Sequence, residues 1–198
     1  EQSKDAFAES GIGIDSFAKI VENDAKYADV FTAYYDEKTG VEPIKASEIE
    51  KYIKDNYARV EIVEISLKDA DGNLLKGADK EKAINRAKSY VKRAATEDFG
   101  TIIYDEHNVR LKQRAEKAGT EYTPVEYNPD EVEEYAFEEL IGKDYSPIPA
   151  SATDEVFAHK DDGKPFLVES AESYFVVKRH NILEREDIME TYKPTIIK

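Results

Sequence analysis

The feature that most constrains the fold lies in residues 56–99, where an apolar-rich strand pattern precedes a turn and a long amphipathic helix. Residues 59–67 carry apolar side chains in both parities, as Val60 and Val63 show. A strand that is apolar on both faces is typical of the centre of a sheet that is covered on most of both sides. We therefore expect residues 59–67 to form a central strand.

The segment after this strand predicts helices. Asp71-Gly72-Asn73 is a turn signal. An apolar stripe then indicates a helix from about 79 to 95, and it comprises Ala83, Ile84, Ala87, Val91 and Ala94. Thr96 is a candidate cap for a short helix that directs Phe99 inward, and residues 107–117 predict a separate charged helix.

The C-terminal half predicts two helices and a hairpin. Asn128-Pro129-Asp130 favours a helix start, with proline at the first helical position, and its apolar face reaches Leu140. An extended linker through Pro147-Ile148-Pro149 follows. Ser151 is expected to cap a short helix that reaches Phe157, and strands are expected at 165–169 and 174–179.

Residues 1–55 predict helices only. Asp15 is a candidate cap for a first helix, and residues 27–35 form a second helical run that is expected to close near Gly40. Ser47-Glu48-Ile49-Glu50 has the capping-box pattern of a third helix. The chain is thus predicted to be α+β, with a helical segment at 1–56 and a sheet-containing domain at 57–198.

Charge and residue content narrow the classes of partner and chemistry. The net charge of −15 over 198 residues disfavours binding to nucleic acid, because an acidic surface repels phosphates. The absence of Cys excludes thiolate chemistry and is consistent with an extracytoplasmic protein. No apolar run approaches a membrane span. Because the sequence begins at Glu1 and not at Met, we expect that an upstream segment has been removed. A cleaved export signal is one explanation, and a lipid-modified upstream region is a candidate membrane anchor.

Three stretches together resemble a parvulin-type peptidyl-prolyl isomerase domain. They are the first strand Tyr57-Ala58-Arg59-Val60-Glu61-Ile62-Val63-Glu64-Ile65, the pair Asp98-Phe99, and the closing hairpin Pro165-Phe166-Leu167-Val168-Glu169 with Ser173-Tyr174-Phe175-Val176-Val177-Lys178-Arg179. The resemblance implies a small antiparallel sheet wrapped by helices, in the order strand, two helices, strand or loop, helix, two strands. Residues 105–150 replace the family's glycine-rich segment and read as an insertion.

The residues that match the family's histidines are apolar here. Ile62 holds the first-strand position and Phe175 the last-strand position. The rotation barrier of the amide is roughly 18–20 kcal/mol. The resemblance implies a hydrophobic proline pocket floored by polar His residues, and because both positions are apolar here, isomerase activity is expected to be weak or lost. We predict no catalytic residue and no cofactor, and a polypeptide-binding groove formed by Ile62, Phe99, Phe157, Phe166 and Phe175.

The resemblance extends to function. Residues 1–55 resemble the helical segment that precedes this module in exported foldases of the PrsA and SurA type. The chain is therefore expected to be an exported chaperone or foldase, located in the periplasm or at the cell surface, that binds unfolded or partly folded polypeptides. A non-catalytic protein-interaction module in the same compartments is the alternative, and a hydrolase with paired carboxylates such as Glu133 and Glu134 is a distant third.

Metal chemistry is not indicated. Asp69-Ala70-Asp71-Gly72-Asn73 has the opening of a calcium loop, but Leu74 and Lys80 occupy positions that need Gly and Glu. The histidines His107, His159 and His180 have no paired spacing. We therefore expect residues 69–73 to form a turn at the exit of the strand and the three histidines to lie separately at the surface.

Overall fold

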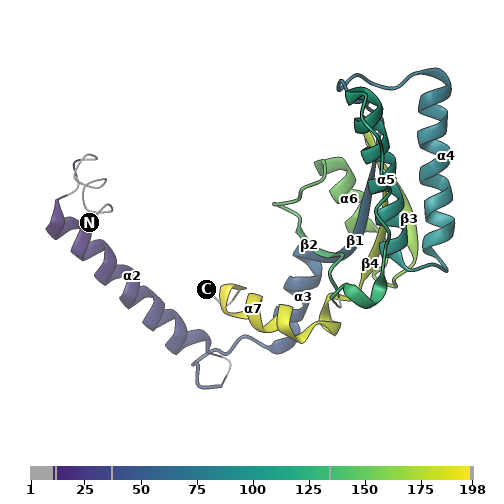
Figure 1. The fold of residues 1–198 in the computed structure, drawn as a ribbon. Helices are drawn as coiled ribbons and strands as arrows, with labels where there is room; N and C mark the ends of the chain where they lie inside the picture. The colour runs from purple at the N-terminus through teal and green to yellow at the C-terminus, as the bar shows by residue number, and fades with distance from the viewer. Residues whose placement is uncertain (1–10, 12, 37, 134, 197–198) are drawn as a thin grey trace. The chain divides into compact units, whose positions relative to one another are not determined.

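The chain divides into two compact units. In this computed structural model, residues 11, 13–36, 38–133 and 135–196 are described. Unit 1 comprises Glu1–Tyr52 with Arg185–Lys198, and unit 2 comprises Ile53–Glu184 (Figure 1). The domain boundary at residue 56 stays a prediction, and residues 185–198 group with the N-terminal helices in this division.

Unit 1 contains helices and no strand among its described residues. They are α2 (Ile14–Tyr35), most of α3 (Ala46–Asn56) and α7 (Glu186–Ile196). The two helical runs expected before residue 36 are one continuous helix. It ends where the Asp36 carboxylate accepts hydrogen bonds from the amides of Lys38 and Thr39, at 3.0 and 2.7 Å. Gly40 lies just beyond this turn.

The capping box expected at Ser47 is shifted along the chain. The helix α3 begins at Ala46, and the Glu48 carboxylate accepts a hydrogen bond of 3.0 Å from the Lys45 amide. The carboxylate thus satisfies a free N–H at the helix start, which is one half of the capping-box arrangement. The polar segment near residue 186 forms a helix, because its apolar residues recur at helical spacing.

Unit 2 is built on a four-stranded antiparallel sheet with the order β2-β1-β4-β3. The strands are β1 (Tyr57–Ser66), β2 (Glu138–Gly142), β3 (Pro165–Glu169) and β4 (Ser173–His180). β1 pairs with β4 over Arg59 to Ser66, and Val63 lies opposite Val176. The first and last strands therefore lie side by side at the centre, as the resemblance predicted.

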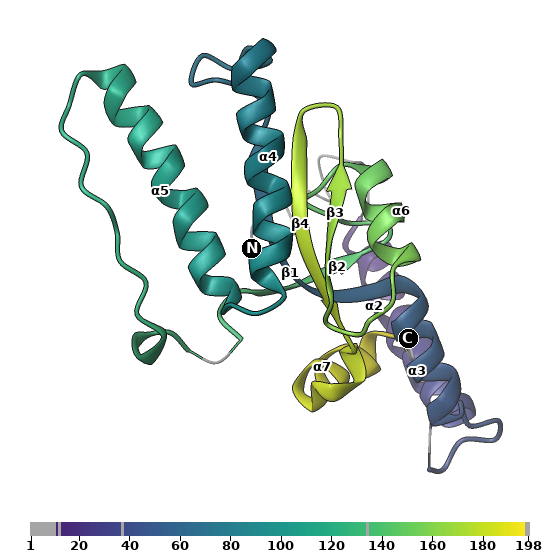
Figure 2. The ribbon, with the colours of Figure 1, turned by 90° about the vertical axis from the view of Figure 1, so that its right-hand side faces the viewer.

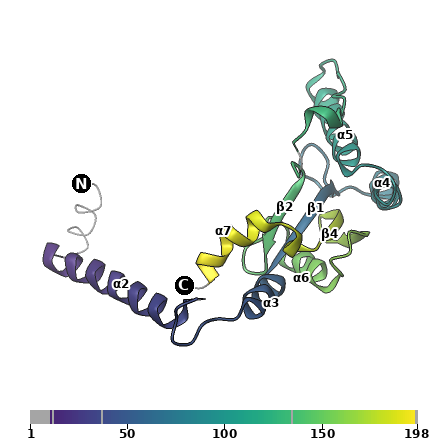
Figure 3. The same cartoon turned by 90° about the horizontal axis from the view of Figure 1, so that it is seen from below.

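Helices cover both faces of this sheet. α4 (Gly77–Ala94) and α5 (Phe99–Ala118) lie on one face, and α6 (Ala150–Ala158) lies on the other (Figures 1 and 3). Short 3-10 turns occur at Pro129–Glu131 and Ile182–Glu184. The order strand, two helices, strand, helix, two strands confirms the α+β prediction, and Figure 2 shows the closing β3–β4 hairpin.

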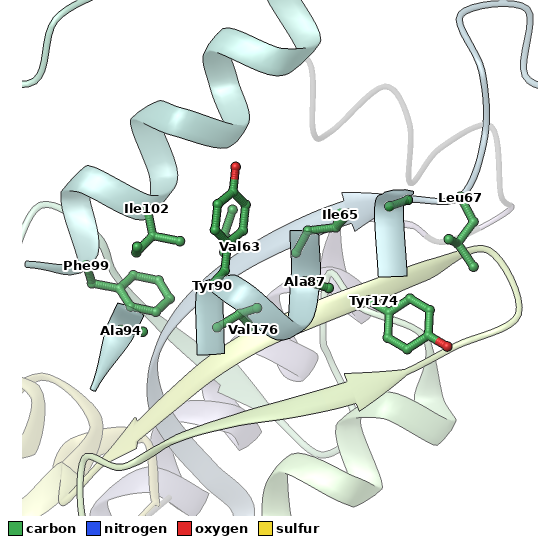
Figure 4. Packing of buried hydrophobic residues seen from close by; sticks show 11 residues of the cluster. Val63, Ile65, Leu67, Ala87, Tyr90, Ala94, Phe99, Ile102, Tyr174 and Val176 are labelled. Atoms are coloured by element: carbon green, nitrogen blue, oxygen red, sulfur yellow. The ribbon is translucent and has the colours of Figure 1, made fainter. Parts of the chain in front are cut away.

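Two separate cores explain why β1 is apolar in both parities. Val63 and Ile65 point toward α4 and α5, where they meet Tyr90, Phe99 and Val176 (Figure 4). The opposite core lies under α6. Its buried members are Ala58, Val60, Ile141, Ile148, Ala152, Val156, Val168, Phe175 and Val177. Side chains alternate across a strand, so a strand buried on both faces needs apolar residues at successive positions.

The prediction of a helix from Pro129 to Leu140 is wrong. Only a 3-10 turn forms at Pro129–Glu131, and Glu138–Gly142 forms β2 instead. Ile141 lies opposite Ala58 and is 1% exposed. Pairing with β1 buries this side chain and satisfies the backbone groups of the segment, which outweighs the local helical preference.

The helix α5 is longer than predicted. Residues 99–118 form one helix, where the sequence indicated two, and the cap is Asp98 instead of Thr96. The Asp98 carboxylate accepts a hydrogen bond of 2.7 Å from the Gly100 amide. Asp98 is a strong N-cap residue because its carboxylate satisfies a free amide of the first turn.

Gly100 allows an aromatic cluster to pack against the start of α5. Tyr104, Tyr127 and Phe137 have ring centroids 5.1–6.2 Å apart. The Tyr127 hydroxyl donates a hydrogen bond of 2.8 Å to Asp98. Desolvation, aided by this bond and by the Asp98 charge, raises the pKa of Tyr127 to about 12.

Gly100→Ala is expected to return the pKa of Tyr127 toward the ordinary tyrosine value. A Cβ at residue 100 would lie 2.6 Å from Phe137 Cε2 and would also overlap Tyr127 Cζ, so the Tyr127 ring must move away from Asp98. The pKa is measured by NMR titration of ring-labelled tyrosine. Gly13→Ala is the control, because no atom lies within 4 Å of its Cβ position. An unchanged Tyr127 titration in Gly100→Ala contradicts the prediction.

Candidate functional site

An open groove lies on the α6 side of the sheet in unit 2. It has a volume of about 650 Å³, and both Ile62 of β1 and Phe175 of β4 line it. The Pro147-Ile148-Pro149 segment and Ser151 form one wall, and the turn at Ser170 to Ser173 forms another. We call this site the β1–β4 groove. It places Ile62 and Phe175 in one hollow.

Carboxylates line the rim of the β1–β4 groove. They belong to Glu64, Glu139 and Glu172. Glu64 accepts a hydrogen bond from the Ser173 hydroxyl and lies 3.4 Å from Arg110 Nη2. Glu172 pairs with Lys68, whereas Glu139 is exposed. The groove therefore offers apolar contacts and negative charge. Such a surface suits an extended peptide with an apolar residue and a neighbouring Lys or Arg.

The five predicted site residues divide into three groups. Ile62 and Phe175 line the β1–β4 groove. Phe157 and Phe166 belong to the same side of the sheet but pack elsewhere on its core. Phe99 is 2% exposed on the opposite side, among residues that contact α4. The structure therefore brings Ile62 and Phe175 together and separates Phe99 from them.

Phe157 and Phe166 contact polar groups near the end of α6. The Phe166 ring stacks on His159, with centroids 3.8 Å apart and planes at 14°. The Phe157 ring lies 5.3 Å from the Arg179 guanidinium and 5.3 Å from Lys143 Nζ. These contacts are cation–π and stacking interactions that fix the two rings against the protein.

Arg179 fixes the end of α6 to β4. Its Nη1 donates hydrogen bonds to the carbonyl oxygens of Val156, Phe157 and His159, at 3.4, 2.8 and 2.7 Å. The last carbonyls of a helix lack partners within the helix, so one buried guanidinium satisfies several of them. Burial lowers the pKa of Arg179, although arginine remains charged. Sequence reasoning took this residue only as part of a strand end.

Sequence reasoning also missed the proline-rich wall of the β1–β4 groove. Pro147-Ile148-Pro149 was predicted to be a linker, yet Ile148 is 8% exposed and belongs to the core under α6. An isoleucine between two prolines was the available signal, because a solvated linker has little need of a large apolar residue.

The remaining motifs have structural roles. The Asp69 carboxylate accepts hydrogen bonds of 2.9 Å from the amides of Asn73 and Asp71. These bonds lower the pKa of Asp69, and the bond from the Asn73 amide has the largest effect. The segment is the turn that the sequence predicted. His180 Nε2 lies 2.9 Å from Glu61, and no metal-binding group of His, Cys, Asp and Glu occurs among the described residues.

Comparison with known proteins shows a similarity to a solved structure. No protein-family model matches the chain, and neither does any curated protein sequence. Foldase protein PrsA from Streptococcus pneumoniae str. Canada MDR_19A is similar with a TM-score of 0.36 and 14% sequence identity. The match covers 98% of this chain and 60% of that protein. Within the described residues, no helix has the length and apolar character needed to cross a membrane.

Proposed function

We propose that the protein is an exported folding factor that binds unfolded or partly folded polypeptides in the β1–β4 groove. Its prolyl isomerase activity is proposed to be weak or absent. The observation that carries this proposal is the shared position of Ile62 and Phe175 in one open groove. These residues stand where the resemblance to parvulins places histidines.

The chemistry of the groove favours binding over catalysis. Prolyl isomerisation requires a twisted amide to be held and its partial double bond to be weakened, against roughly 18–20 kcal/mol. Ile62 and Phe175 offer only apolar contact. The Ser173 hydroxyl already donates to Glu64, and the rim carboxylates accept hydrogen bonds without donating them. A proline ring can therefore lie on an apolar floor, and the side chains of that floor supply no polar partner for its amide.

An isomerase and binding assay tests this function. We expect that the protein does not measurably accelerate cis–trans isomerisation of the Lys–Pro bond in a Lys-Pro-Phe peptide. We also expect the same peptide to bind saturably. Ile62→Lys places a cation on the apolar floor beside the bound Lys, and binding is expected to weaken by at least about tenfold. Leu74→Lys is the matched control, because Leu74 is 51% exposed and lies outside the groove.

Two outcomes would overturn parts of the proposal. Robust isomerase turnover would restore catalysis to this groove and remove the claim of lost activity. Equal peptide affinity in Ile62→Lys and Leu74→Lys, with both variants folded by circular dichroism, would remove the β1–β4 groove as the binding site.

A non-catalytic interaction module is the second candidate, and α2 supports it. None of the residues described in α2 is buried. Val30, Tyr27 and Ile14 are 66%, 65% and 62% exposed. Exposed apolar side chains that recur along a helix are typical of a protein-binding surface. Protection of a denatured client from aggregation favours the folding factor, and absence of protection at stoichiometric excess favours the interaction module.

The proposed compartment is extracytoplasmic, in the periplasm or at the cell surface, with a lipid-modified upstream region as the proposed anchor. The absence of Cys supports this location, because a protein without thiols is insensitive to an oxidising compartment. Cell fractionation with and without detergent tests both the compartment and the anchor.

A further inference from the structure

The central strand β1 has an edge that β2 leaves open. β2 pairs with Tyr57 to Glu61, whereas β4 pairs with β1 as far as Ser66. We call residues 62–66 on the β2 side the β1 edge. No other described strand pairs with it. We propose that the β1 edge binds an extended acidic polypeptide segment, which adds to the sheet as a further antiparallel or parallel strand.

The hydrogen bonds around β1 show which backbone groups face outward. The Asn56 carbonyl accepts from Lys143 on the β2 side, at 3.0 Å, and the Leu67 amide donates to Glu172 on the β4 side, at 2.8 Å. Backbone N–H and C=O groups alternate sides along a strand, so even-numbered residues face the β2 side. Ile62, Glu64 and Ser66 therefore direct their backbone groups toward the β1 edge.

Arg110 confirms this direction and covers part of the edge. Its Nη2 donates a hydrogen bond to the backbone carbonyl of Glu64. A charged side chain over an open strand is one way in which proteins prevent uncontrolled pairing. Arg110 side-chain exposure is 39%, so an incoming strand can displace it, and its guanidinium can then pair with a carboxylate of that strand.

Several cations gather beside the β1 edge, although the protein as a whole is strongly acidic. A depression of about 620 Å³ lies there, and its lining includes four cations. These are Lys68, Arg110, Arg114 and Lys117, together with the acids Glu64 and Asp69. Lys68 pairs with Glu172, Lys117 with Asp71 and Arg110 with Glu64. Arg114 is exposed, and no ion pair is found for it within the described part of the chain. In a chain whose net charge is −15, Arg114 and a displaced Arg110 supply cations next to the edge, and these two charges favour an acidic segment.

The β1 edge differs in chemistry from the β1–β4 groove, although Glu64 lines both. The groove holds an apolar floor and carboxylates on the α6 side, whereas the edge holds backbone groups and cations next to α5. Acidic strand addition does not depend on the function proposed for the groove. Basic apolar peptides test the groove and acidic extended peptides test the edge, so the two proposals fail separately.

Fluorescence anisotropy with a labelled peptide of alternating Val and Asp tests the proposal on the full chain. We expect saturable binding that the double variant Arg114→Glu, Lys117→Glu weakens by at least about tenfold, because two cations near the acidic strand change sign. Lys88→Glu with Lys92→Glu is the matched control. It makes the same change in net charge on exposed positions of α4, and its affinity should equal that of the wild type.

A peptide with N-methyl groups at alternate residues separates strand addition from attraction of charge alone. It keeps its carboxylates but loses half of its amide donors, so its affinity should fall strongly. NMR should also show slower amide exchange at residues 62 and 66 when the unmethylated peptide binds. Equal binding of both peptides, or equal loss in both double variants, overturns the proposal.

Discussion

Replacing Arg179 with Met is expected to destabilise unit 2 by about 2–4 kcal/mol. Arg179 is 9% exposed, and its Nη1 serves three carbonyl oxygens at the end of α6. Met keeps much of the apolar stem and adapts to irregular space. The loss therefore comes mainly from the carbonyls of Phe157 and His159, which lose the donor that Arg179 supplies. The Arg179 Nε atom is buried without a hydrogen-bond partner, and its removal limits the loss.

Urea denaturation measures this change in the free energy of unfolding. Lys88→Met is the control, because Lys88 is exposed on α4, and its effect should stay within about 0.5 kcal/mol. Hydrogen exchange adds a local readout: the amide of His159, which donates to the carbonyls of Glu155 and Val156, should lose protection first. Equal urea midpoints for Arg179→Met and wild type would show that α6 does not depend on this contact.

Arg86→Met is expected to destabilise unit 2 by about 3–5 kcal/mol at neutral pH. The Glu106 carboxylate is 2% exposed on α5 and accepts hydrogen bonds from Arg86 Nε and Nη2, at 2.7 and 3.3 Å. Burial already raises the pKa of Glu106 above its ordinary value. Removing Arg86 leaves a buried charge without its main partner and raises that pKa further.

The loss in Arg86→Met should depend on pH with a definite sign. A carboxyl with a raised pKa in the folded state keeps its proton where the unfolded chain has released it. Its contribution to stability is present below the unfolded pKa, near 4.5, and is lost as the pH rises through the folded pKa. The destabilisation should therefore be larger at about pH 7.5 than at about pH 5.

Adding Glu106→Gln to Arg86→Met provides the control for this pH dependence. Gln keeps the shape of the side chain and carries no titrating proton. In the Glu106→Gln background, the cost of adding Arg86→Met should therefore be the same at both pH values. A deficit in Arg86→Met that is equal at both pH values would show that Glu106 is not the titrating group responsible.

The sequence predicted those elements whose local pattern and tertiary role agree. The strand at 165–169 matches β3, and the helix expected at 79–95 is α4 within two residues. The pairing of β1 with β4 followed from the resemblance to parvulins, since pattern alone does not select a partner strand. Apolar residues at both parities of β1 also predicted a sheet covered on two sides, which the two cores confirm.

The failures occur where tertiary contacts decide the outcome. Pro129 favours a helix start, yet Ile141 reaches the core only if its segment pairs with β1. Two other features depend on chain segments that are distant in sequence. They are the groove wall at Pro147-Ile148-Pro149 and the hydrogen bonds from Arg179 to the end of α6. Among the predicted site residues, Ile62 and Phe175 lie in the same groove because β1 and β4 are neighbours. Phe99 is the first residue of α5, and that helix packs on the opposite face of the sheet.

The pairing of β1 with β4 has a consequence for synthesis of the protein. Arg59 lies opposite His180, so the central ladder needs residues from both ends of unit 2. Contacts of such wide sequence separation close large loops and slow folding. A nascent chain that has emerged only as far as α5 contains β1 but not yet β4, the strand with which β1 pairs along the centre of the sheet. Unit 2 is therefore expected to reach its native state only after residue 180 has left the ribosome. Until then it exposes unfolded segments of the kind that the protein itself is proposed to bind.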